Sequence, residues 1–154
     1  MKLKVIVLSL AVFFVAAVVC AAQNPNIGTW KLNEAKSKFG PGSARNQTVV
    51  YEAAGDQVKV TVDGIDGNGH PTHNEWTGKF DGKYYAVTGD ATSDTRSYRR
   101  INSRTLALSA KKADKVVLTG TITVSRNGKT RTVITNGTDA KGKRVHNTAV
   151  YDKQ

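Results

Sequence analysis

The chain has 154 residues and carries 23 Lys and Arg against 12 Asp and Glu, a formal net charge of +11. This length suits one domain, and a single cysteine excludes an internal disulfide framework. The positive balance favours anionic partners, namely acidic ligands, cell-surface polymers or nucleic acid. The alternative is a basic protein whose charge serves only solubility.

The first segment has the pattern of a secretory signal peptide. Two lysines precede an almost wholly apolar run from Val5 to Val19, and small residues follow it. The run is shorter than the roughly 20 residues of a membrane-spanning helix. We therefore expect residues 1–22 to be removed by cleavage after Ala22, which leaves residues 23–154 as an exported domain in the periplasm or the medium. Lipid attachment at Cys20 is the alternative.

Short apolar or alternating runs fill the rest of the chain, and Gly, Asn and Asp turn signals separate them. Such alternation is typical of half-buried strands. The stretch TITVSRNGKTRTVIT is the clearest hairpin, because Asn-Gly favours a two-residue turn. One helical turn is expected near residues 33–38. Strands are predicted at 27–32, 46–54, 57–63, 72–80, 83–89, 95–101, 105–111, 115–125, 130–136 and 143–152.

This succession of strands predicts an all-β fold, an antiparallel up-and-down barrel of about eight to ten strands. A meander removes its exposed edges best by closing on itself. Segments 48–74 and 121–147 also match at a constant offset of 73 residues, with eight identities and no gap. This match indicates two duplicated halves, and chance similarity among Gly- and Thr-rich hairpins is the other interpretation.

Both ends of the domain resemble the calycin superfamily, which contains the lipocalins and the fatty-acid-binding proteins. GTWKLN at residues 28–33 is similar to the Gly-x-Trp of the family's first strand, and NTAVYDKQ is similar to the last strand of the fatty-acid binders. The resemblance implies a bacterial-type exported lipocalin-like barrel in which Trp30 closes one end. It also implies that Tyr151 contacts a ligand, although the two carboxylate-binding arginines of the fatty-acid binders fall on Ala149 and near Thr123.

The lumen of such a barrel can be predicted from alternation, because successive side chains of a strand point to opposite faces. An inward arginine could hold a carboxylate through two parallel hydrogen bonds. Three alternatives remain: the arginine faces solvent, the asparagines satisfy backbone groups, and Trp30, Trp76 and Tyr84 only fill the core. The predicted ligand-binding residues are Asn74, Trp76, Phe80, Arg131, Asn147 and Tyr151.

No motif for catalysis or for a metal is recognisable. HPTHNE offers His70, His73 and Glu75, but a zinc site needs three or four converging ligands. DGIDGNG lacks the ligand spacing of a calcium-binding EF-hand loop, and G-x-S-x-G is absent. We therefore expect no catalytic residue, metal or cofactor, and regard an enzyme on this scaffold as the less favoured alternative. TRSYRR at residues 95–100 is interpreted as a solvated exterior, so no nucleic-acid partner is expected.

These observations predict an exported, monomeric protein that holds a small, partly apolar and acidic ligand in a barrel lumen. The alternative is a packed barrel without a lumen ligand, which would serve as an envelope or surface interaction module for anionic polymers. The mature domain is expected to contain no transmembrane segment. The sequence does not name the ligand.

Overall fold

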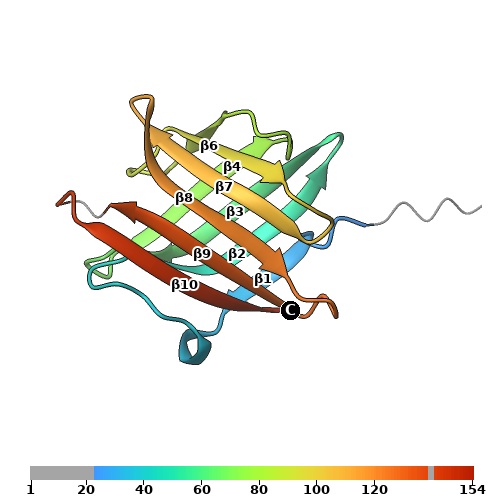
Figure 1. Cartoon of the computed structure of the whole chain (residues 1–154), viewed down its shortest axis with the longest axis horizontal. Coiled ribbons are helices and arrows are strands. Elements are labelled where there is room, and N and C mark those ends of the chain that lie inside the picture. Colours follow the sequence, from blue (N-terminus) through green and yellow to red (C-terminus); the bar gives the residue numbers. More distant parts are fainter. Residues whose placement is uncertain (1–22, 139–140) are drawn as a thin grey trace, which may run out of the picture.

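The computed structural model describes residues 23–138 and 141–154 (Figure 1). The predicted signal peptide, its cleavage site after Ala22 and the alternative lipid site at Cys20 lie outside the described residues.

Ten antiparallel strands form one closed barrel, in which each strand pairs with its neighbours in sequence and β1 pairs with β10. The predicted meander barrel is confirmed. Figure 1 shows β7 to β10 on the near wall and β2 to β4 behind them. The strands are β1 (Gly28–Leu32), β2 (Arg45–Ala54), β3 (Gln57–Ile65), β4 (Pro71–Gly78), β5 (Tyr85–Thr88), β6 (Thr95–Arg100), β7 (Thr105–Lys112), β8 (Lys115–Val124), β9 (Thr130–Thr138) and β10 (Arg144–Lys153).

The connection between β1 and β2 contains the expected helical turn, a short 3-10 helix η1 (Glu34–Lys36). Asn33 begins it, because its side chain accepts a hydrogen bond from the Lys36 N–H. The chain then returns to β10, where Lys38 forms an isolated bridge with Thr148. Within the described residues, no helix has the length and hydropathy needed to cross a bilayer.

The two ends of the barrel differ in what they carry. One end, called here the closed end, holds the β2–β3, β4–β5, β6–β7 and β8–β9 connections together with the start of β1 and the end of β10. The other, called the open end, holds the remaining connections. Trp30 is fully buried at the closed end, and its indole N–H donates to the Asn26 carbonyl at 2.8 Å. This tryptophan therefore covers the base of the core.

The internal match found in the sequence corresponds to one hairpin used twice. Adding 73 to the bounds of β3 gives the bounds of β9, and the β3–β4 pairing register recurs in β9–β10. A cross-strand hydrogen bond recurs as well. His73 Nδ1 lies 2.6 Å from Asp63 Oδ1, and His146 Nδ1 lies 2.7 Å from Asn136 Oδ1. The shared register supports the interpretation of duplicated halves.

Candidate functional site

The candidate site is centred on Arg131, which β9 directs into the barrel. Arg131 is only 2% exposed and lies directly opposite Tyr151 of β10. Its guanidinium carbon lies 4.7 Å from the ring centre of Tyr151, 5.0 Å from that of Tyr51 and 5.1 Å from that of Trp30. These three rings, from β1, β2 and β10, are called the aromatic cage. Each ring face attracts the cation electrostatically.

The hydrogen-bonding capacity of Arg131 is incompletely used. Its Nε and Nη1 atoms are buried without a hydrogen-bond partner, and no carboxylate of the described residues lies within ion-pair distance of it. A buried charge needs compensation by a counter-charge and hydrogen bonds, because desolvation of an ion is expensive. The aromatic cage supplies part of that compensation. An anion beside the guanidinium would supply the rest.

The two tyrosines of the cage remain protonated across the neutral range. Burial raises the pKa of Tyr151 to about 12, although the charge of Arg131 acts in the opposite direction. Burial also raises the pKa of Tyr51, and proximity to Tyr98 adds to this effect. A neutral phenol keeps its O–H donor. The cage can therefore offer an acidic group both the guanidinium and a hydroxyl.

A second inward arginine, Arg96 of β6, has the partners that Arg131 lacks. Its Nη2 donates to Asn74 Oδ1 and forms an ion pair with Asp90 Oδ2, both at 3.2 Å. Burial acts to raise the pKa of Asp90, but hydrogen bonds from Ser93 and Thr92 outweigh it and the net pKa is lowered. Segment 95–100 was predicted to be a solvated exterior. Arg99 and Arg100 are exposed as predicted, whereas the prediction is wrong for Arg96 and Tyr98, which alternate inward and line the core.

Aromatic rings gather on the wall opposite the cage. The Trp76 ring centre lies 4.7 Å from that of Tyr98 and 6.4 Å from that of Phe80, and its indole N–H donates to the Arg96 carbonyl. Both Trp76 and Tyr98 are buried. Tyr84 does not belong to this core, contrary to the alternative considered above. It is 37% exposed and rests on the outside, where its hydroxyl lies 2.8 Å from Ser109 Oγ.

All six predicted ligand-binding residues belong to the interior, but they do not form one cluster. Asn147 lies four residues from Tyr151 along β10, roughly 13 Å in an extended strand. Its Oδ1 accepts a hydrogen bond from the Gly40 N–H at 2.8 Å, so it anchors the β1–β2 connection. Arg131 and Tyr151 do come together. Trp30 and Tyr51 join them and were not predicted as partners, although the alternation of Val49 and Tyr51 in β2 could have placed Tyr51 inside.

Two hollows lie near the open end. The larger, of about 470 Å³, lies where β8 separates from β9 and β10 and is lined in part by Val116, Leu118 and Val145. The smaller, of about 400 Å³, lies between the β1–β2 connection and the β3–β4 turn. Arg131 lines neither of them. Both volumes fall within the range of small-molecule pockets.

The histidines are on the outside and contact acidic or amide neighbours. His70 Nδ1 lies 3.2 Å from Asp66 Oδ2 in the β3–β4 turn. The Asp66 carboxylate also accepts hydrogen bonds from the backbone N–H groups of Asn68 and His70. Within the described residues, no group of three or more His, Cys, Asp or Glu side chains is placed to hold a metal ion.

Comparison with known proteins identifies the fold alone. No family model and no curated protein matches the chain. A solved structure described as EF1p2_mFAP2b bound to DFHBI is similar with a TM-score of 0.51 and 11% identity, over 84% of this chain and 94% of that chain. A redesigned beta barrel gives a TM-score of 0.49 and 13% identity, over 88% of this chain and 97% of that chain. The similarity to the first of these structures extends to the closed antiparallel β-barrel.

Proposed function

We propose that this protein is an exported, lipocalin-like barrel that binds a small, partly apolar ligand through an acidic group held at Arg131. The observation that carries the proposal is the contrast between the two inward arginines. Arg96 is neutralised by Asp90, whereas Arg131 is buried without a carboxylate among the described residues. A ligand carboxylate beside Arg131 and Tyr151 would give Arg131 the counter-charge that Asp90 gives Arg96.

Access to the site would run along the inner face from the open end. Leu108, Leu118 and Val133 on that face are only partly buried, whereas Trp30, Val60 and Val124 at the closed end are fully buried. The apolar part of the ligand would lie against the partly buried side chains, at about 25 cal/mol per Å² of apolar surface removed from water. Export is supported by the signal-peptide pattern of the first 22 residues.

The test compares dodecanoate with dodecanol, which share a chain but differ in the acidic group. Binding would be followed by tryptophan fluorescence, since Trp30 lies against Arg131. We expect the wild type to prefer the acid by about 10- to 100-fold, the range of a charge-assisted hydrogen bond. Arg131→Met should equalise the two affinities. Arg104→Gln, an arginine on the closed-end β6–β7 turn, is the matched control and should keep the preference.

If Arg131→Met fails to fold, Tyr151→Phe provides the second variant and should reduce the preference without abolishing it. Equal affinity of the wild type for the acid and the alcohol would contradict the role of Arg131. No binding of either compound would instead favour the packed barrel that lacks a lumen ligand.

A further inference from the structure

Charge is distributed unequally between the two halves of the barrel. Residues 23–94 contain seven basic and nine acidic residues, a net charge of −2, whereas residues 95–154 contain fourteen basic and three acidic residues, a net charge of +11. The second segment builds β6 to β10, which are consecutive in the barrel. One continuous wall therefore carries the whole positive excess.

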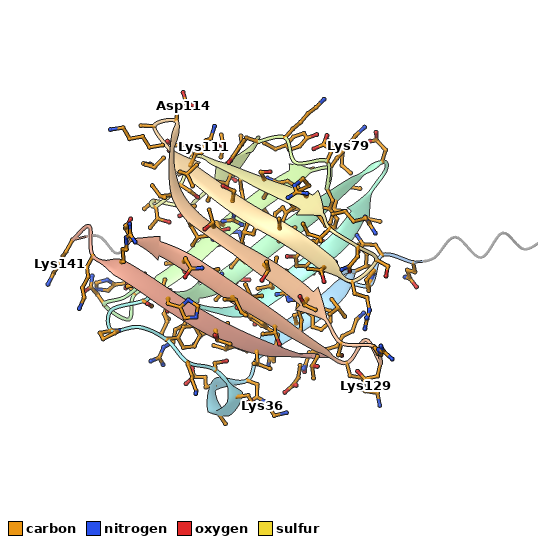
Figure 2. All side chains as sticks on the ribbon, viewed as in Figure 1. Lys36, Lys79, Lys111, Asp114, Lys129 and Lys141 are labelled. Atoms are coloured by element: carbon orange, nitrogen blue, oxygen red, sulfur yellow. The ribbon has the colours of Figure 1, made fainter. Side chains whose placement is uncertain are left out.

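At the closed end of this wall, turns and strand ends bring basic residues together. The Val124 N–H donates to the Arg104 carbonyl at 2.9 Å, and the Lys153 N–H donates to the Lys129 carbonyl at 2.9 Å. These bonds connect the β6–β7 turn, the β8–β9 turn and the end of β10. Figure 2 shows Lys129 at this end, and Asp114 and Lys141 at the opposite one. The group is called the basic edge and consists of Arg100, Arg104, Arg126, Lys129 and Lys153.

No member of the basic edge forms an ion pair with a described carboxylate. In the second segment, Arg96 and Lys112 do form such pairs, and they use Asp90 and Asp94 of the β5–β6 connection. The edge follows five neighbouring strands, a length on the order of 20 Å at the usual strand spacing. Its charge is therefore available to a partner outside the barrel.

The edge also carries an apolar side chain at its tip. Ile101 follows Arg100 in the β6–β7 turn and is 49% exposed. The Asn102 side chain accepts a hydrogen bond from the Arg104 N–H at 2.9 Å, and Asn127 makes the corresponding contact with the Lys129 N–H at 3.0 Å. Both turns are thus held in shape by their own side chains. They present basic groups and one aliphatic group at the same end of the barrel.

From this arrangement we propose that the basic edge docks the protein on an anionic lipid bilayer. Hydrogen bonds hold these turns side by side across several strands, and such a broad charged surface suits a bilayer better than a single extended polyanionic chain. Basic residues near an anionic surface each contribute about 1 kcal/mol, and an aliphatic side chain can enter the interfacial region. Lys153 Nζ lies 5.1 Å from the ring centre of Trp30, so this one member of the edge adjoins the aromatic cage. The other four members do not belong to the cage, and the test of the proposal therefore leaves Lys153 unchanged.

The experiment measures co-sedimentation of the exported form with vesicles of phosphatidylcholine, with and without phosphatidylglycerol. The wild type should bind only the anionic vesicles. The edge variant combines Arg100→Gln, Arg104→Gln, Arg126→Gln and Lys129→Gln, and it should bind at least about a hundredfold more weakly. The control variant removes the same charge elsewhere and should bind within about threefold of the wild type. It combines Lys36→Gln, Lys38→Gln, Lys115→Gln and Arg144→Gln.

Two further measurements separate a bilayer from other partners. Ile101→Asn should weaken vesicle binding by about tenfold, as expected for loss of a buried aliphatic group. Equal loss in the edge and control variants would overturn the proposal, because net charge alone would then explain binding. Binding to heparin without binding to anionic vesicles would also overturn it and would indicate a polyanionic chain.

Discussion

At the scale of single residues, the two inward arginines show how environment sets the role of one residue type. Arg96 has a carboxylate and an amide as partners, and its ion pair fixes the β5–β6 connection. Arg131 has three aromatic rings and no carboxylate among the described residues. The repeat makes the contrast sharper, because the positions equivalent to Arg131 and Tyr151 hold Val58 and Gly78. The second copy of the hairpin therefore has a polar pair where the first has none.

Removal of the Tyr151 hydroxyl should alter stability at alkaline pH. The pKa of Tyr151 is raised from 10.0 to about 12 in the folded state, so the folded protein binds this proton more tightly than the unfolded chain. The resulting stability is complete below pH 10 and is lost as pH rises toward 12, roughly 2–3 kcal/mol in all. Tyr151→Phe should flatten this loss. Urea unfolding of the wild type and of Tyr151→Phe, at neutral pH and at about pH 11, measures the loss of unfolding free energy. An equal loss in the two proteins would contradict the prediction.

At the scale of elements, glycines allow the strands of the barrel to pack closely. A Cβ on Gly120 of β8 would lie 2.2 Å from the Ile134 carbonyl oxygen of β9, which is backbone and cannot rotate away. Gly128 in the β8–β9 turn has a φ of +71°, and a Cβ added there would meet nothing within 4 Å. Gly120 is therefore required because β9 leaves no room for a side chain, and Gly128 because its backbone is left-handed. The two cases have different energetic consequences.

Alanine substitutions at these positions should separate the two effects. Gly120→Ala should lower the free energy of unfolding by about 2–3 kcal/mol, because β8 and β9 must move apart. Gly128→Ala should lower it by about 1 kcal/mol, the cost of a left-handed backbone for alanine. Thr119→Ala, on the exposed face beside Gly120, serves as the control. Equal losses at the two glycines by urea denaturation would contradict the close contact.

At the scale of the whole molecule, barrel closure brings the two ends of the domain together. The Gln154 N–H donates to the Thr29 carbonyl at 3.0 Å, and β1 pairs with β10. The first and last strands are thus hydrogen-bonded neighbours. The chain could therefore begin at another strand without a change in the pairing of the barrel. The charge asymmetry also belongs to this scale, because it depends on which strands share a wall.

A circular permutant should therefore fold. Joining Gln154 to Asn24 through a short Gly-Ser linker and opening the chain between Gly55 and Asp56 leaves every strand intact, since this turn is exposed. The permutant should keep the near-ultraviolet circular dichroism of the parent and a cooperative thermal transition. A permutant opened between Thr121 and Ile122, inside β8, is the matched control and should not fold. An unfolded Gly55–Asp56 permutant would contradict the argument.

The sequence by itself determined the ten strands, the barrel and the inward face, because alternation and turn residues act over a few neighbouring positions. It placed Arg131 and Tyr151 on one face for the same reason. Only the tertiary structure decided that Trp30 and Tyr51 surround Arg131, that Asn147 holds Gly40, and that Asp90 pairs with Arg96. The contacts of Arg131 with Trp30 and Tyr51, and of Asn147 with Gly40, join residues far apart in the chain. All of these contacts depend on how the strands twist and close and on how far each side chain reaches. Local periodicity carries no information about these distances.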